Sequence, residues 1–398
     1  MKGVEVHLKP IEDAIRDYFV PALLDLDAAD VEGNFRKLVA HGVKQGGLNI
    51  RDPCACAPRL YQSSLEASAV LVKSLVEHGN LDSTEHKQCV RKAGATARKE
   101  RMESEDKFVE SVKATAPKAV KKRMDRIGMT GAWLTAVPNL LDGTLLSAEE
   151  WRDNARIRYG LKPLKMCDRC DGCGERFTVE HGLSCKKGGL VNQRHDDARD
   201  EAANLCAMAL TNSRVSCEPL IHYGRDVNAS QATGAEAGVA AGARSNTAGD
   251  EARGDIAAHG LINRSETCIM DMRVTDTDSK SYSSSSSEKV LERAAKLKKD
   301  KYLQPCLERR RSFIPLVYSV DGMACKEALA WEKRIASMLA KKHDRQYSEM
   351  VGFVRSRMSL AIIRSNTLML RGARQGRAFR PELDDSAAFD ALSRSRGW

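Results

Sequence analysis

Four side chains that bind soft metals lie close together near the middle of the chain. They are Cys170, Cys173, His181 and Cys185, all within sixteen residues. Thiolate and imidazole ligands at such short intervals are typical of a small tetrahedral zinc site. A redox or merely buried thiol cluster is the simpler interpretation, but a lone pair of cysteines two residues apart does not usually come with a nearby histidine. We therefore expect these residues to hold a structural Zn²⁺ ion.

One further cysteine makes this ligand set ambiguous. Cys167 precedes Cys170 by the same spacing that separates Cys170 from Cys173. Either pair has a spacing that suits one side of a tetrahedral site, so one of the three cysteines must be spare. Spacing alone leaves open which one it is.

A second group of residues has the chemistry to hold a hard cation. If residues 267–275 form a strand, Asp271 and Arg273 lie on one face, with Met270 and Met272 on the other. Asp255 lies on a preceding candidate strand, so a hairpin between the two strands brings a second carboxylate beside Asp271. Two adjacent carboxylates repel unless a proton or a divalent cation joins them, and Mg²⁺ prefers such oxygen ligands.

A lysine-rich helix follows these strands. Lys298 and Lys301 are one turn apart on it and can face the same cleft as the two carboxylates. The alternative is a buried ion pair between Asp271 and Arg273 beside a solvated lysine face, and spacing does not separate the two interpretations. Arginine stays protonated near neutral pH, so Arg273 can bind phosphate but cannot act as a base.

The elements that must position these residues can be located along the chain. Helical periodicity is expected in the segments 11–26, 31–41, 57–77, 87–126, 194–210, 288–303, 327–342 and 347–365. Ser147 and Glu150 have the spacing of a capping box, which starts another helix. Strands are expected at 254–258, 267–275 and 313–319, and Pro305 should stop the helix before the last of them. Serine-rich residues 283–287 predict a flexible loop.

The acidic segment resembles the PD-(D/E)XK nucleases, in which carboxylates hold a metal ion and a lysine orients the attacking water. Two positions depart from that pattern. Gly254 stands where the family has proline, and Arg273 stands at the usual lysine position. The resemblance therefore moves the lysine role to the following helix, to Lys298 or Lys301, with Tyr302 beside them.

In their order along the chain, the motifs resemble the C-terminal part of polyproteins from non-LTR retrotransposons that carry a restriction-like endonuclease. The similar segments are 46–53, 61–64, 133–138, 158–160, 170–173, 179–189, 194–197, 253–256, 270–276, 298–302 and 313–317. This resemblance makes Cys167 the spare cysteine and implies that Asp255 and Asp271 hold Mg²⁺. Arg194 and His195 are expected either to cap the helix under the knuckle or to contact DNA.

The implied fold is α+β. A helical, thumb-like region at 1–130 precedes a linker helix and CCHC zinc knuckle at 131–192. A restriction-endonuclease-like domain with a mixed sheet flanked by helices follows at 193–375, with a disordered insertion at about 225–250 and a tail at 376–398.

The implied function is nicking of double-stranded target DNA to prime reverse transcription, with element RNA as a further partner. No polymerase activity is expected, because the Asp-Asp pairs at 196–197 and 384–385 lack the strand pattern of a reverse-transcriptase palm. One alternative is an inactive, zinc-containing nucleic-acid-binding remnant of the same element. Another is a structural zinc protein that binds only protein.

Charge and composition agree with a nucleic-acid partner but are weak evidence for it. The chain has 398 residues and a net charge of +10, which favours polyanions through counterion release. Its first 26 residues have neither a signal-peptide core nor a membrane span, so we expect a nuclear or cytoplasmic protein. Its twelve cysteines should be reduced thiols apart from the metal ligands.

Overall fold

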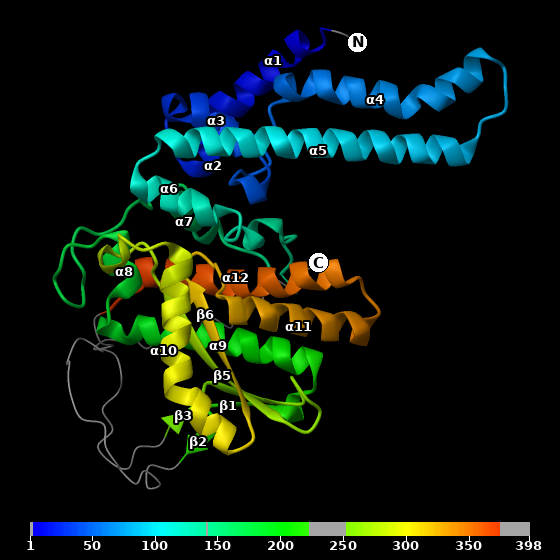
Figure 1. Cartoon of the computed structure of the whole chain (residues 1–398). Coiled ribbons are helices and arrows are strands. Elements are labelled where there is room, and N and C mark those ends of the chain that lie inside the picture. Colours follow the sequence, from blue (N-terminus) through cyan, green and yellow to red (C-terminus); the bar gives the residue numbers. More distant parts are fainter. Residues whose placement is uncertain (1–2, 141, 223–251, 375–398) are drawn as a thin grey trace, which may run out of the picture.

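The computed structural model describes residues 3–140, 142–222 and 252–374. In these residues the protein is mostly helical and has a small mixed sheet, so the expected α+β class is confirmed (Figure 1). The insertion expected at about 225–250 and the tail expected at 376–398 lie outside the described residues. No helix among the described residues is long and apolar enough to cross a membrane.

The N-terminal part is a set of helices. They are α1 (Glu5–Ala14), a π-helical turn (Ile15–Phe19), α2 (Val20–Leu24), α3 (Gly33–Ala40), α4 (Pro53–Val76), α5 (Ser83–Thr115) and α6 (Lys118–Ile127). The single helix expected at 87–126 is wrong, because α5 and α6 are separate. Pro117 forces the residue before it, Ala116, into an extended conformation, which ends α5. Helices α4 and α5 form an antiparallel hairpin that projects from the molecule (Figure 1).

The middle of the chain contains α7 (Ala148–Arg158), α8 (Val179–Ser184) and α9 (Leu190–Ala209). The capping box at the start of α7 is confirmed: the Glu150 amide donates to Ser147 Oγ at 3.2 Å, and the Ser147 amide donates to Glu150 Oε2 at 2.7 Å. Helix α9 begins four residues earlier than expected. Arg194 and His195 therefore lie inside it, and the expectation that they cap the helix is wrong.

A four-stranded mixed sheet forms the centre of the C-terminal part. Its strands are β1 (Val215–Cys217), β4 (Ile256–His259), β5 (Thr267–Thr275) and β6 (Ser312–Ser319), in the order β1-β4-β5-β6. Pairing is antiparallel except between β5 and β6, which are parallel and are connected through α10 (Ser287–Glu308). Strands β2 (Leu220–His222) and β3 (Ala252–Arg253) form a separate pair. The expected bounds of β5 are confirmed, whereas β4 begins two residues later than expected.

Helices cover both faces of the sheet. Helix α10 lies on one face, where Tyr302 packs on Phe313 and Ile269. Helices α9 and α11 (Lys326–His343) lie on the other face against Met270 and Met272. The alternation expected along β5 is therefore confirmed, since Met270 and Met272 face the core opposite to Ile269 and Asp271.

Two helices continue further than the sequence predicts. Helix α10 runs through Pro305 to Glu308, so the expectation that proline stops it is wrong. Proline removes only one backbone donor near the end of the helix, and the buried side chains of Tyr302 and Cys306 hold this turn against the sheet. Helix α12 (Tyr347–Arg371) runs six residues beyond the expected Ser365.

Helix α12 joins the three parts of the chain. Its Leu360 and Ile363 pack with Val20 and Trp133 of the N-terminal part. Its Met369 and Leu370 pack with apolar side chains of α8 and α9 beside the cysteine-rich segment. The N-terminal helices and the cysteine-rich segment are thus both packed on the same helix, α12.

Candidate metal centre and acidic cleft

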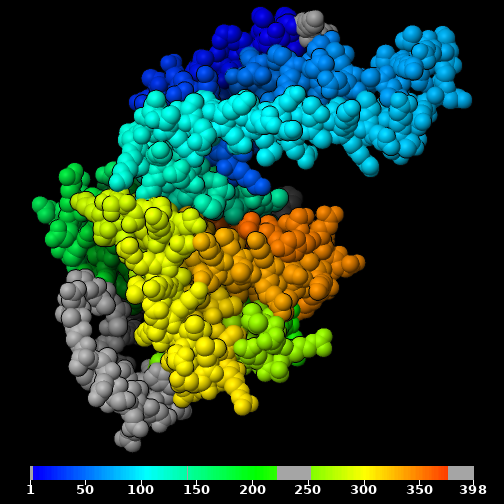
Figure 2. Space-filling view, in the orientation of Figure 1, coloured from blue at the N-terminus to red at the C-terminus, as the bar shows by residue number. Residues whose placement is uncertain are grey.

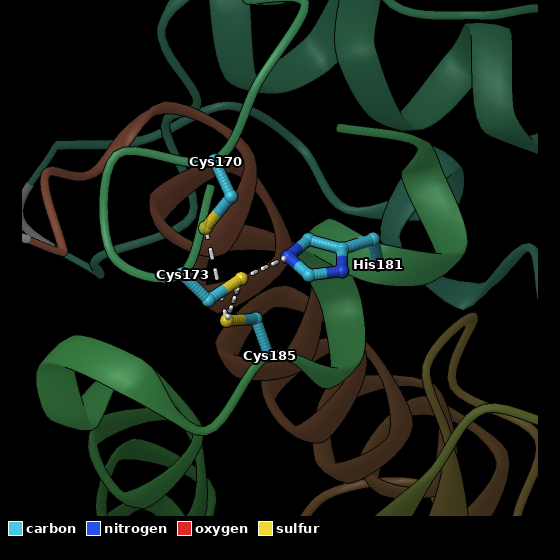
Figure 3. A group of neighbouring side chains, drawn as sticks. All are labelled: Cys170, Cys173, His181 and Cys185. Atoms are coloured by element: carbon cyan, nitrogen blue, oxygen red, sulfur yellow. Dashed lines mark hydrogen bonds between the residues drawn. The ribbon is translucent and has the colours of Figure 1, made fainter. Parts of the chain in front are cut away.

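The four expected zinc ligands converge on one point. Within the described residues, Cys170, Cys173, His181 and Cys185 are a group whose ligand atoms all lie within 4.8 Å of one another (Figure 3). The Cys185 sulfur is 3.8 Å from that of Cys170 and 3.9 Å from that of Cys173, and Cys173 Sγ is 3.4 Å from His181 Nε2. Zinc–sulfur bonds of about 2.3 Å in a regular tetrahedron place sulfur atoms about 3.8 Å apart. The side chains could thus hold a metal such as zinc.

Local turns bring these ligands together. The Cys170 amide donates to the Glu175 carbonyl at 2.8 Å, and Gly174 has a φ of 76°, which closes the turn around Cys173. Thr178 then caps α8 by accepting from the His181 amide at 3.1 Å. His181 lies in α8 and Cys185 at its end, so this short helix presents the other two ligands.

The surroundings of Cys170 favour its thiolate form. Burial raises the pKa of this thiol, but hydrogen bonds from His181 and from nearby backbone amides outweigh burial and bring the pKa to about 6. A thiolate is the form that binds metal. Cys167 lies exposed and outside this group, as the family resemblance implies.

Helix α9 is tied to this cysteine-rich knuckle. Arg194 is buried, and its Nη1 donates to the Leu183 carbonyl of α8 at 3.0 Å. Burial lowers the pKa of Arg194 to about 10. Although Arg194 is not the helix cap that we expected, its hydrogen bond attaches the knuckle to helix α9.

The two expected carboxylates lie on neighbouring strands. Asp255 is in the turn before β4, and its amide donates to the Met270 carbonyl of β5 at 3.0 Å. Asp271 is the next residue of β5, and only 4% of its side chain is exposed. Backbone pairing therefore places both acids at the same point of the sheet. We call the site formed by Asp255, Asp271 and Lys298 the acidic cleft.

Lys298 completes this cleft from α10. Its Nζ forms an ion pair with Asp271 Oδ2. The alternative of a buried pair between Asp271 and Arg273 is wrong, because Arg273 Nε instead donates to Thr275 Oγ1 at 3.2 Å.

Lys301 and Tyr302 have other contacts. Lys301 is exposed, and its Nζ lies 4.7 Å from the centre of the Tyr302 ring. Tyr302 is buried, with its ring 5.6 Å from that of Phe313. Of the two candidate lysines, the structure brings Lys298 to the carboxylates.

Sequence reasoning missed the role of His195 in this cleft. His195 Nε2 lies 3.1 Å from Asp255 Oδ2, which also accepts from the Met272 amide at 2.5 Å. Burial lowers the pKa of His195, but the hydrogen bonds and negative charges of Asp255 and Asp196 together outweigh burial and raise the pKa overall. One signal was present: His195 shares a helical face with Ala198 and Ala202, which point into the core.

The remaining acids of α9 do not join the cleft. Asp197 Oδ2 accepts from Ser365 at 2.8 Å, Asp200 pairs with Arg199, and Glu201 pairs with Arg357 at 2.7 Å. The contacts of Asp197 and Glu201 connect α9 to α12, whereas that of Asp200 stays within α9.

The two carboxylates of the cleft differ in their electrostatics. Burial raises the pKa of Asp271 to about 6; Lys298 lowers it and Asp255 raises it. For Asp255, burial also raises the pKa, but His195, the Met272 amide and Lys298 together outweigh burial and lower the pKa overall. An ionised Asp271 is therefore disfavoured, and an added cation between the carboxylates would relieve this cost.

The cleft offers fewer metal donors than the knuckle. In the part of the chain that the structure describes, only the knuckle brings together three or more His, Cys, Asp or Glu donors in metal-binding reach. Asp255 and Asp271 would thus supply two oxygens. Mg²⁺ is commonly held by one or two carboxylates, with water and substrate phosphate in its other positions.

Packing and hydrogen bonding explain why position 254 holds glycine and not the proline found in the nuclease pattern that this segment resembles. The Gly254 amide donates to the Pro219 carbonyl at 3.0 Å, a bond that proline cannot make. A Cβ at this position would lie 2.5 Å from Ile269 Cγ2. Glycine is therefore required by its neighbours directly before the first carboxylate.

Comparison with known proteins adds no relative to this picture. No protein-family model matches the chain, and no curated protein is significantly similar to it. The function of the chain is therefore inferred from the geometry of the two sites.

Proposed function

We propose that the chain is a metal-dependent DNA endonuclease of a non-LTR retrotransposon, which nicks target DNA for target-primed reverse transcription. The observation that carries this proposal is the convergence of Asp255, Asp271 and Lys298 from a turn, a strand and a helix. A four-stranded mixed sheet flanked by helices, with the two acids on adjacent strands, supports it. The net charge of +10 suits a DNA partner.

The residues of the cleft would have different roles in phosphodiester hydrolysis. Mg²⁺ bound by Asp255 and Asp271 would neutralise charge on the scissile phosphate and lower the pKa of bound water. Met272 N–H and His195 both bind Asp255 Oδ2 and so fix the orientation of that carboxylate. Lys298, which pairs with Asp271, would orient the attacking water or bind a phosphate oxygen.

In this proposal the knuckle is a structural zinc module. Arg194 and the apolar contacts of α8 with α12 attach it to the nuclease part. DNA synthesis is not part of the proposal. Asp196 and Asp197 are on helix α9 and bind Arg199 and Ser365, and the other Asp-Asp pair lies outside the described residues.

A second candidate function is binding of nucleic acid without cleavage. It is favoured by the pairing of both acids within the chain, since Asp271 binds Lys298 and Asp255 binds His195. These contacts give each carboxylate a partner within the chain.

A nicking assay separates the two functions. Zinc-loaded protein is incubated with supercoiled plasmid and Mg²⁺ or Mn²⁺, and open-circular product is measured for the wild type and Asp271→Ala. The nuclease proposal predicts nicking by the wild type and none by the variant. Binding of the plasmid without nicking supports the second function, and equal nicking by both proteins would show that the assigned site is wrong.

A further inference from the structure

A concave, positively charged pocket lies between the N-terminal helices and the start of α10. Its volume is about 380 Å³. The N-terminal helices rest here on the segment that leads into α10, coloured yellow (Figure 2). The lining residues are Lys118, Lys121, Lys122, Asp125, Arg126 and Met129 of the α6 segment, residues 283–288 at the start of α10, and Met323.

The anionic groups near this pocket are already paired. Asp125 binds Lys113 at 3.1 Å, and Glu288 lies 3.7 Å from Lys326, a residue outside the pocket. Arg126 is buried and binds Asp278 and Asp321, each at 2.6 Å. The acids that line the pocket therefore do not neutralise its lysines.

The three lysines of α6 provide the positive charge of the pocket. Lys122 Nζ donates to the carbonyls of Thr277 and Tyr282 at 2.5 and 2.9 Å, so neutral acceptors fix its position. Lys118 and Lys121 are exposed and form no ion pair with any residue that the structure describes. Three cations around one concavity attract an anion with several acceptor oxygens.

Donors on the opposite wall suit the same kind of anion. Residues 283–287 are all serine, and Ser286 caps α10 by accepting from the Lys289 amide at 3.3 Å. Arg126 Nη1 lies 3.3 Å from Ser287 Oγ. The flexible loop expected here is therefore wrong for its last residues, which form the cap and first turn of α10. Their hydroxyl groups line the pocket as further donors.

We infer that this pocket binds a phosphodiester group of the nucleic-acid backbone, away from the acidic cleft. The inference rests on the proposed function for the identity of the polymer. Lysine ammonium and serine hydroxyl groups are common phosphate donors that carry no sequence preference. The pocket would thus hold the substrate in register without selecting its sequence.

Helix α10 sets the distance between this contact and the site of cleavage. Ser287 borders the pocket and Lys298 lies in the cleft, eleven residues further along the same helix. A rise of 1.5 Å per residue separates them by about 17 Å. For a duplex that runs parallel to α10, with about 3.4 Å for each base step, the contacted phosphate would lie about five base pairs from the scissile one.

The test uses the full chain with Lys118→Ala and Lys121→Ala together. Lys333→Ala with Lys341→Ala, two exposed lysines of α11, is the charge-matched control. Affinity for a 30-base-pair fluorescent duplex is measured by anisotropy with Ca²⁺ in place of Mg²⁺, between roughly 50 and 300 mM KCl. Nicking at saturating DNA is measured separately.

The inference predicts that the pocket variant binds about tenfold more weakly at 150 mM salt and that its salt slope is shallower by about 2. The control should keep the wild-type slope. Ser285→Asp, which adds a negative charge to the wall, should weaken binding in the same direction. An equal change in both double variants would overturn the inference.

Inorganic phosphate distinguishes a small-anion site from a backbone site. If the pocket binds free phosphate while its lysines leave the DNA salt slope unchanged, the backbone assignment is wrong. If the wild type binds DNA with the predicted salt slopes but does not nick it, only the proposed function is contradicted. If the wild type nicks DNA but the lysine substitutions do not change its affinity or salt slope, only this inference is contradicted.

Discussion

The knuckle and the acidic cleft are assembled in different ways. The knuckle takes its four ligands from sixteen consecutive residues, and one tight turn and one short helix bring them together. The cleft takes its groups from α9, the turn before β4, strand β5 and helix α10. A local site depends on the turn that forms it, whereas a site built from distant segments depends on the packing of the whole C-terminal part.

Their electrostatics differ as well. In the knuckle, the surroundings lower the pKa of Cys170 to about 6, so its ligand form is favoured. In the cleft, burial raises the pKa of Asp271 to about 6, so its ligand form is disfavoured without a cation. The Cys170 thiol is thus suited to bind metal, whereas the buried Asp271 carboxylate has an electrostatic cost that a metal cation would relieve.

The largest expected effect distinguishes ligands within the knuckle. Cys170→Ser should lose bound zinc and destabilise the protein, because zinc affinity contributes directly to folding, by about 10 kcal/mol in small zinc modules. Cys167→Ser is the matched control and should keep one zinc per chain. Metal content by atomic emission spectrometry and thermal unfolding measure both. Zinc loss in the Cys167 variant but not in the Cys170 variant would reverse the ligand assignment.

The next effect separates the two lysines of α10. Lys298→Ala should lower the nicking rate by about 100-fold or more, because it removes the cation beside Asp271. Lys301→Ala should stay within about threefold of the wild type, since Lys301 lies outside the cleft; this range is about 0.7 kcal/mol. Both variants should keep their zinc, because the knuckle does not use α10. A greater loss in Lys301→Ala would move the catalytic role to that residue.

The raised pKa of Asp271 predicts that the stability of the folded protein depends on pH. A folded-state pKa near 6, above the ordinary 3.8, means that the folded protein binds the Asp271 proton more tightly than the unfolded chain. The contribution of Asp271 to stability is therefore fully present below about pH 4 and is lost as the pH rises through 6.

Asp271→Asn should accordingly raise the free energy of unfolding at pH 8, by up to about 3 kcal/mol for a two-unit shift. The gain should vanish near pH 4, as urea unfolding at both pH values would show. A variant that is less stable than the wild type at pH 8 would contradict the assigned electrostatics. Zinc content should not change in either case.

The smallest effect concerns the turn before Asp255. Gly254→Ala places a Cβ 2.5 Å from Ile269 Cγ2 and should destabilise the protein by about 1–2 kcal/mol, as overpacking usually does. Nicking should fall, because Asp255 is the next residue, and zinc should stay bound. Gly352→Ala on α12, where a new Cβ has open space, is the matched control. Equal stability of the two variants would show that the turn can adapt.

The sequence predicted local features better than tertiary ones. The knuckle ligands, the capping box at Ser147 and strand β5 follow from short-range spacing, which one segment specifies by itself. The start of α9 was placed four residues late, because Gly189 and the turn before it begin the helix without a side-chain cap. This shift moved Arg194 and His195 from the helix end to its interior.

The choice between Lys298 and Lys301 shows why part of the cleft was not predictable. Both are on α10, and their spacing allows either to face the carboxylates. The burial of Tyr302 against Phe313 fixes the rotation of the helix, and Lys298, one turn before Tyr302, then points to Asp271. That rotation depends on a contact between distant segments, which the pattern of α10 does not contain. His195 was missed for the same reason.

The most direct test of the central claim is a side-by-side nicking measurement on zinc-loaded protein at increasing Mg²⁺ concentration. The wild type is compared with Asp255→Asn and Asp271→Asn, and Asp300→Asn, an exposed acid of α10, is the control. The account predicts Mg²⁺-dependent nicking by the wild type and the control, and a loss of about 100-fold or more in both cleft variants. Nicking that survives in both cleft variants, or a wild type that binds DNA with no Mg²⁺-dependent product, would contradict it.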